Sequence, residues 1–314
     1  MSIHVNVDNF VRAETDRMFA DLQRDTGGIN RILHNREPAS VERQTVVRLN
    51  RDTLYSFAVV DLAEGATLRL PDHGDRYVSA MVVNQHHHVN AIHHEPGEHH
   101  LSVEAFETPY VLVAIRTLVD STDPADVAAA TAVQDQVVIE ARSSRAFSMP
   151  DYDMAALDET REALLRLARG MTDFSRMFGS RAEVDPVRHL IGTAAGWGGL
   201  PSREAIYVGV EPRLPVGTYQ IRVGEVPVDG FWSISVYDAS GFFVPNDAGV
   251  YSVNSVTGVR DPDGSLTVRF GDHGPGAPNA IPIMDGWNYL VRLYRPRPEI
   301  SEGRWQFPVI EPVG

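Results

Sequence analysis

The sequence predicts an α+β, mainly β protein with a β-rich N-terminal domain, a helical middle segment and a C-terminal β-sandwich or jelly-roll-like domain. Short runs rich in Val, Ile, Thr and aromatic residues, closed by Gly, Pro, Asn or Asp, dominate both ends of the chain. Apolar residues at helical spacing are concentrated between them. Short strands at regular spacing with turn signals are typical of a sandwich. The expected domains are residues 1–122, 123–200 and 201–314.

The N-terminal domain is expected to begin with a helix over residues 8–22, because its apolar residues recur on one side. Asn6 or Asp8 is placed to cap this helix, and Gly27-Gly28 ends the region. The rest of the domain consists of strand-like segments. The expected strands cover residues 45–50, 55–61, 67–70, 76–89 and 110–117.

The middle segment is expected to hold three helices, over residues 123–141, 153–169 and 185–191. An Asp-Pro pair opens the first and the third, where Asp can cap the helix and Pro suits its first turn. Gly170 and Gly192 are the expected stop signals. After the third helix, GTAAGWGGLP is expected to form a glycine-rich loop.

The C-terminal domain contains only strand and turn patterns from residue 205 onward. Turn signals lie at residues 238–241 and 261–264. The expected strands cover residues 205–210, 219–223, 231–237, 250–253, 266–270 and 289–294.

The composition excludes several kinds of chemistry, because the chain of 314 residues contains neither cysteine nor lysine. Without cysteine there is no thiolate nucleophile and no iron–sulfur cluster. Without lysine there is no anchor for pyridoxal phosphate (PLP) and no Walker-type phosphate loop. The glycine-rich loop lacks the spacing of a dinucleotide motif and follows a helix, not a strand. Catalysis would therefore rest on His, Asp, Glu, Ser, Thr, Tyr, Arg or a bound metal.

The net charge of −14 argues against nucleic acid and against an anionic membrane as partners. No stretch approaches the roughly 18 unbroken apolar residues of a membrane span. The first residues lack the cationic and apolar pattern of a signal peptide. We therefore expect a cytoplasmic protein whose partner is a small-molecule ligand, and for which a homo-oligomer is an open alternative.

Seven of the twelve histidines lie between His86 and His100, in QHHHVNAIHHEPGEHH. Imidazole is widely used for metal binding and for proton transfer near neutral pH. If the start of this run is extended, His86 and His88 point to one face and His87 to the other. The density of imidazoles makes this run the strongest candidate for a site.

A turn at Pro96-Gly97 predicts a hairpin in which His93 and His94 face the last two histidines of the run. Such pairs could share a metal ion. The spacing matches neither the zinc-protease motif nor the cupin motif. A solvated hairpin without function is the alternative. The candidate ligands of a transition metal are His86, His88, His93 and His94.

Other polar residues are candidates for a site. Arg188-His189 follows a helix start and could place a cation and an imidazole at a pocket wall, or form a buried structural contact. The polar run 50–53 could supply a carboxylate and an amide, or simply turn the chain. Trp197 and Trp232 could line a pocket, although aromatic residues are core residues by default.

The N-terminal half resembles domain of unknown function 1254, through VVRLNRDTLYSFAVVDL, DRYVSAMVV and AIRTLVDSTDPADV. The C-terminal half resembles domain of unknown function 1214, through VDPVRHLIGTAAGWGG, VPVDGFWSISVYD, DPDGSLTVRFG and GWNYLVRLYRPRPEI. The resemblance covers nearly the whole chain. It implies two β-rich domains joined by helices and no particular reaction.

The resemblance implies that His87 is the family-like position, whereas His86 and His88 are departures from it. His93-His94 stands where relatives tend to have aromatic residues. A metal site on these departures would thus belong to a subgroup. A site common to the family would instead lie around Asn50, Asp52, His87, Arg188, His189 and Trp197.

Our leading hypothesis from the sequence is an enzyme that acts on a small molecule in a cleft between the two domains, by hydrolysis or elimination. His87 is the expected general acid/base, oriented by Asp52, and His189 is the third catalytic candidate. On this hypothesis His87→Ala abolishes turnover and leaves the melting temperature nearly unchanged. The expected substrate-binding residues are Asn50, Arg188, Trp197 and Trp232.

Two alternatives stay open at this point. One is a metal-dependent enzyme with cupin-like chemistry, built on the histidine run and requiring Fe, Mn, Zn or Cu. The other is a non-catalytic binding or assembly module that uses the faces of its sandwich.

Overall fold

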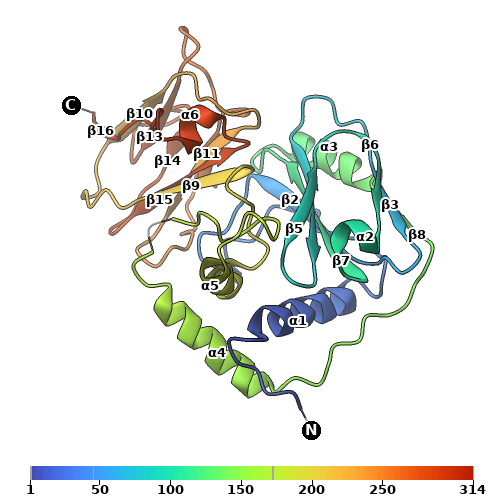
Figure 1. The fold of residues 1–314 in the computed structure, drawn as a ribbon. Helices are drawn as coiled ribbons and strands as arrows, with labels where there is room; N and C mark the ends of the chain where they lie inside the picture. Colours follow the sequence, from blue (N-terminus) through green and yellow to red (C-terminus); the bar gives the residue numbers. More distant parts are fainter. Residues whose placement is uncertain (1, 45, 172, 314) are drawn as a thin grey trace. The chain divides into compact units, whose positions relative to one another are not determined.

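The computed structural model describes residues 2–44, 46–171 and 173–313, and contacts divide the chain into two compact units (Figure 1). Unit 1 comprises Met1–Arg36, Leu54–Leu118 and Ala129–Ser202. Unit 2 comprises Glu37–Thr53, Val119–Ala128 and Arg203–Gly314. Each unit thus combines segments that lie far apart in the sequence. The predicted α+β, mainly β class is confirmed, because sheets form the core of both units.

Unit 1 is built on two sheets that share one hydrophobic core. The first sheet has the order β1 (Leu33–His34), β2 (Thr53–Asp61), β7 (Tyr110–Leu118), β4 (Val78–Asn84) and β5 (Val89–His93). The second has the order β6 (Gly97–Leu101), β3 (Ala66–Leu70) and β8 (Val138–Ala141), with the short helix α2 (Val103–Phe106) beside it. Alternation along β7 sends Val113 and Ile115 into the core and Arg116 to the opposite face.

Three helices of unit 1 share a second hydrophobic core, and Figure 1 shows them next to one another. They are α1 (Phe10–Asp25), α4 (Met154–Leu167) and α5 (Pro186–Gly196). Asp153 and Asp185 cap α4 and α5, since each side chain accepts two backbone N–H groups. Helix α3 (Pro124–Asp135) starts in unit 2 and ends in unit 1. None of the helices in the described residues is long and apolar enough to cross a membrane.

Unit 2 is the predicted β-sandwich. Its first sheet has the order β14 (Ala280–Ile281), β13 (Leu266–Phe270), β10 (Tyr219–Val223) and β16 (Glu311–Pro312). Its second sheet has the order β12 (Ser252–Asn254), β11 (Trp232–Tyr237), β15 (Asn288–Tyr294) and β9 (Ala205–Val210). Helix α6 (Pro298–Ser301) follows β15. The inner faces of both sheets contribute to one hydrophobic core, as a sandwich requires.

The outer face of the second sheet of unit 2 is polar and yet buried. Along β11, Trp232, Ile234 and Val236 enter the sandwich core, so Ser233 and Ser235 point the other way. The segment 48–52 lies over this outer face, because its backbone carbonyls and side chains bond to it. This second layer explains how serines on a strand come to be fully buried.

The strand predicted over residues 45–50 is wrong in its described part, since residues 46–50 form no strand. Residue 45 lies outside the described residues. Arg48 has φ 54°, which extended backbone does not allow. The Arg48 N–H donates to the Gly241 carbonyl, and the Arg48 carbonyl accepts from the Arg292 side chain. These two backbone groups are therefore not paired in a strand ladder.

Three boundaries in the first two hundred residues also differ from the prediction. The run 76–89 is interrupted by a turn at residues 85–88, and residues 138–141 form strand β8, not the end of a helix. Helix α5 continues through Gly192 to Gly196. A Cβ on Gly192 would lie 2.8 Å from the Met177 Cβ, so this glycine serves close packing and does not end the helix.

The hairpin predicted at Pro96-Gly97 is wrong. Strand β5 pairs with β4 in the first sheet of unit 1, whereas β6 pairs with β3 in the second sheet. The segment 94–96 therefore joins two sheets. A Pro-Gly turn signal is local and does not specify which strand becomes the partner of each arm.

Candidate functional site

His87 lies in the turn between β4 and β5, in unit 1, and is fully buried. Asn84 builds this turn, since its carbonyl accepts from the His87 N–H and its side-chain oxygen accepts from the N–H groups of His86 and His88. The turn gives His87 a φ of 58°, which is uncommon for a residue with a side chain. The local geometry therefore directs this one imidazole inward.

Hydrogen bonds fix the tautomer of His87. The Thr193 hydroxyl donates to the His189 carbonyl at 2.9 Å, so it accepts from Nδ1 of His87 at 2.8 Å. The other ring nitrogen, Nε2, accepts from the Gly198 N–H at 2.8 Å. Burial holds the pKa of His87 well below 6.5, with smaller contributions from His189 and His88. His87 is thus neutral and has no lone pair left for a substrate.

His87 belongs to a group of stacked aromatic rings that also contains His88, His189 and Trp197, and we call these four residues the histidine stack. The Trp197 ring lies 5.2 Å from the His87 ring, and the His189 ring lies 5.3 Å from it. His88 stacks on His189 at 5.1 Å. Burial lowers the pKa of His88 to about 4, helped by His189. The stack is a packed, hydrogen-bonded element of unit 1.

His189 is held between two carbonyl groups. Its Nδ1 lies 2.8 Å from the Met177 carbonyl oxygen and its Nε2 lies 3.1 Å from the His86 carbonyl oxygen. His189 therefore joins α5 to the turn at residues 85–88, and both of its nitrogens are occupied.

The four candidate metal ligands do not gather around one point. The His86 and His88 rings are 6.2 Å apart, whereas His93 stacks on His99 at 4.1 Å. His94 Nδ1 lies 2.9 Å from the Val78 carbonyl oxygen. Over the ranges that the structure describes, no group of three or more His, Asp or Glu side chains is arranged to hold a metal ion. The geometry gives the metal hypothesis no support.

Arg188 does not offer a free cation. Its Nη2 lies 2.6 Å from an Asp173 carboxylate oxygen, and its Nε donates to the Ser175 carbonyl. The guanidinium therefore holds the loop before α5, and its charge is already matched.

Asp52 belongs to unit 2 and is fully buried. Its Oδ2 accepts from the Ser233 hydroxyl at 2.6 Å, and Ser252 also hydrogen-bonds to the carboxyl. Its Oδ1 has no hydrogen-bond partner among the described residues. Burial raises the pKa of Asp52, although Arg292 and the two serines act in the opposite direction. A buried carboxyl with one unused oxygen is unusual and calls for an explanation.

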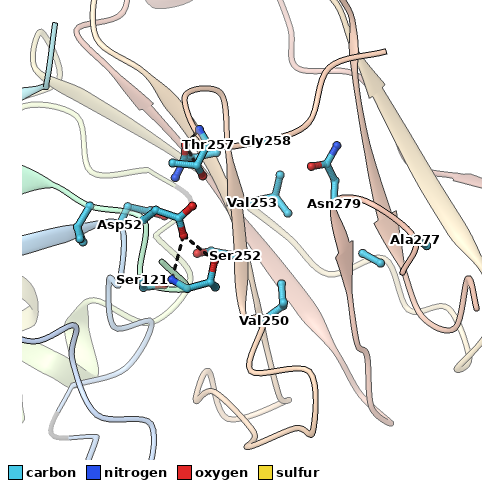
Figure 2. A pocket seen from close by; sticks show the side chains of 14 residues that line it. Asp52, Ser121, Val250, Ser252, Val253, Thr257, Gly258, Ala277 and Asn279 are labelled. Atoms are coloured by element: carbon cyan, nitrogen blue, oxygen red, sulfur yellow. Dashed lines mark hydrogen bonds between the residues drawn. The ribbon is translucent and has the colours of Figure 1, made fainter. Parts of the chain in front are cut away.

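The Asp52 carboxyl borders a cavity of about 180 Å³, which we call the Asp52 pocket (Figure 2). Its wall is formed within unit 2 by the segment before β2, residues 119–122, strand β12 and the segment before β14. Polar groups dominate the wall; the principal ones are Asp52, Asp120, Ser121, Ser252, Asn254 and Asn279. A cavity of about 150 Å³ can hold benzene, so this one has room for a small molecule.

The side-chain amides of Asn254 and Asn279 on this wall already form hydrogen bonds to backbone groups. Asn254 Oδ1 accepts from the N–H groups of Val256 and Thr257, at 2.9 and 2.8 Å. Asn279 bonds through both its oxygen and its nitrogen to the backbone of Val259. The Asp52 carboxyl differs from them, because it retains an acceptor with no protein partner.

Arg292 lies on the outer face of β15 and is buried. Its guanidinium donates to Ser235, to Tyr237 and to the carbonyls of Arg48 and Leu49. Burial alone would lower the pKa of Arg292, but Tyr237, Tyr294 and Asp52 together raise it. Arg292 thus supplies a fixed positive charge and holds the backbone that leads into Asp52.

The other predicted binding residues have structural partners. Asn50 Oδ1 accepts from the Asp52 N–H at 2.9 Å, and its Nδ2 donates to the Tyr294 hydroxyl, so it shapes the turn that carries Asp52. Trp232 is a core residue of the sandwich. Trp197 is part of the histidine stack and donates to Thr15. The hydrogen bonds of His87 go to Thr193 and Gly198, and Asp52 belongs to the other unit.

The sequence reasoning missed Ser233, Ser252 and Arg292. A signal was present, since polar residues occupy every second position of WSISVY and one position of NYLVRLY inside otherwise apolar strands. Such alternation is typical of a strand with one solvent-facing side. Only the layer formed by residues 48–52 makes this side buried.

Comparison with known proteins supports the resemblance seen in the sequence. Residues 29–100 match the family model of a protein of unknown function, DUF1254, and residues 214–298 match that of a protein of unknown function, DUF1214. No curated protein matches the chain in sequence.

Two solved structures show a similar fold. The VPA0106 protein from Vibrio parahaemolyticus has 19% identity and a TM-score of 0.77, with 98% of each chain covered. A putative uncharacterized protein from Burkholderia cenocepacia has 14% identity and a TM-score of 0.52, with 96% of this chain and 86% of that chain covered. The chain thus combines an N-terminal DUF1254 match with a C-terminal DUF1214 match, in the order that the sequence predicted.

Proposed function

We propose that the protein is an enzyme that acts on a small polar molecule in the Asp52 pocket, with Asp52 as general acid/base. The observation that carries the proposal is the Oδ1 atom of Asp52, which is buried and has no protein partner at the border of a cavity. Leaving a buried acceptor unpaired costs about 1–3 kcal/mol, so its retention favours a role in binding or catalysis.

The surroundings of Asp52 suit proton transfer. Burial raises the pKa of the carboxyl toward the range in which a group can both take up and release a proton. Ser233 and Ser252 hold one oxygen, which leaves Oδ1 for water or for a substrate group. Hydrolysis through an activated water, or elimination by proton removal, would need only this carboxyl and bound substrate.

The geometry favours Asp52 over His87 as the base. Both ring nitrogens of His87 are hydrogen-bonded, and its ring is stacked against those of His189 and Trp197. Using His87 would require breaking a contact inside the core of unit 1. Using Oδ1 of Asp52 breaks no hydrogen bond within the described residues.

The test is a turnover screen with three proteins: the wild type, Asp52→Asn and the control Asp263→Asn. Asp263 is an exposed carboxylate of the same unit that does not line the pocket. A panel of esters, amides and hydroxylated compounds of fewer than ten non-hydrogen atoms is incubated with each, and consumption is followed by proton NMR.

We expect at least one compound to be consumed by the wild type and by Asp263→Asn, with a loss of at least 100-fold in Asp52→Asn. Equal turnover by Asp52→Asn would contradict the role of Asp52. If compounds bind but none is consumed, the protein is a binding module and the proposal of catalysis fails.

A further inference from the structure

We infer that the ligand of the Asp52 pocket carries a positively charged group with N–H donors, such as a primary ammonium. This inference concerns the chemical class of the ligand and rests on the proposal that the pocket is the functional site. Two observations carry it: the charges of the pocket wall, and the Oδ1 atom of Asp52, which lacks a hydrogen-bond partner among the described residues.

The wall of the pocket is acidic. Asp52 and Asp120 both line it, and none of its lining residues in the described chain is Arg or His. Lysine is absent from the whole sequence. A phosphate or carboxylate group would find no cation here and would meet two carboxyl groups, so anionic ligands are disfavoured.

The unpartnered Oδ1 of Asp52 is the second, independent observation. The residue is 1% exposed, so bulk water does not solvate its carboxyl. Arg292 is close enough to affect its pKa, yet the hydrogen bonds of the guanidinium go to Ser235, Tyr237 and two carbonyls. The carboxyl therefore lacks a donor on the pocket side, and an ammonium group would supply one.

Charge decides between an ammonium and a hydroxyl group as the donor. Hydrogen bonds in which the donor or acceptor is ionised are roughly twice as strong as those between neutral groups. A cation in this pocket would also compensate the carboxylate whose ionisation burial disfavours. An alcohol would donate a hydrogen bond to Oδ1 but add no positive charge to that of Arg292.

The test uses three probes of nearly the same size: propylammonium, 1-propanol and propionate. Binding to the wild type, to Asp52→Asn and to the control Asp263→Asn is measured by isothermal titration calorimetry at constant ionic strength. We expect propylammonium to bind at least tenfold more tightly than 1-propanol and propionate to bind more weakly than either. In Asp52→Asn the preference for propylammonium should fall at least tenfold, while Asp263→Asn should match the wild type.

Equal affinity for propylammonium and 1-propanol, preference for propionate, no binding of any probe, or an unchanged preference in Asp52→Asn would each overturn the inference. The outcome is separable from that of the turnover screen. Selective ammonium binding without turnover of any compound would leave the inference standing and refute catalysis. Asp52-dependent turnover of a neutral compound without ammonium selectivity would support catalysis and overturn the inference about the ligand.

Discussion

At the scale of single residues, two buried titratable groups have opposite environments. His87 has partners on both ring nitrogens and is stacked against two aromatic rings. Asp52 is equally buried but retains an oxygen without a partner. Burial drives both groups toward their neutral forms. Only Asp52 can offer an atom to a ligand, so we assign His87 to stability and Asp52 to function.

This assignment predicts that His87→Ala destabilises unit 1 by about 3 kcal/mol, because it leaves a cavity and removes the acceptor of the Gly198 N–H. The structure therefore reverses the expectation that the melting temperature would stay nearly unchanged. The measurement is urea unfolding followed by circular dichroism. His100→Ala is the control, since this histidine is exposed and should change stability by less than about 0.5 kcal/mol. Equal stability of the two variants would refute the structural role.

At the scale of elements, local signals predicted most helices and strands. The Asp side chain that caps α5 was visible in the sequence, and so were five strands of the sandwich, β9, β10, β11, β13 and β15, to within one residue. These features depend on neighbours in the chain. Strand pairing does not, which is why the arms flanking Pro96-Gly97 could not be assigned to different sheets. The burial of Ser233 likewise depends on residues about 180 positions away.

Helix α5 provides a test of packing at this scale. A Cβ on Gly192 would lie 2.8 Å from the Met177 Cβ and 3.3 Å from Phe178, whereas at Gly196 the nearest atom is 3.6 Å away. Gly192→Ala should therefore destabilise the protein by about 1–3 kcal/mol, in spite of the better helix propensity of Ala. Gly196→Ala should leave stability equal or raise it slightly. Thermal unfolding of both variants checks this, and a stable Gly192→Ala would show that Met177 and Phe178 can move aside.

At the scale of the whole molecule, the two units hold two different kinds of polar cluster. The nitrogens of His87 in unit 1 are both hydrogen-bonded, whereas the Asp52 carboxyl at the pocket of unit 2 retains an oxygen without a partner in the described residues. Histidine density in the sequence pointed to the first cluster, because spacing shows where imidazoles gather but not whether their nitrogens are occupied. The second cluster combines Asp52 with residues 119–122 and with residues 180 or more positions later, so no local pattern could reveal it.

The raised pKa of Asp52 also predicts how the stability of the molecule depends on pH. A carboxyl whose pKa is higher in the folded state than its ordinary value of 3.8 stabilises the fold fully below that value. This contribution is lost as the pH rises through the pKa of the folded state. Asp52→Asn should therefore gain stability relative to the wild type as the pH rises above 3.8, and the gain should level off above the folded-state pKa.

The most direct test is a pH titration of the Asp52 carboxyl carbon by carbon-13 NMR, with Asp52→Asn identifying its signal. Our account predicts a midpoint clearly above 3.8, which propylammonium shifts downward because it favours the ionised carboxyl. A midpoint at or below 3.8 that propylammonium leaves unchanged would contradict the account, because Asp52 would then be an ordinary structural carboxylate.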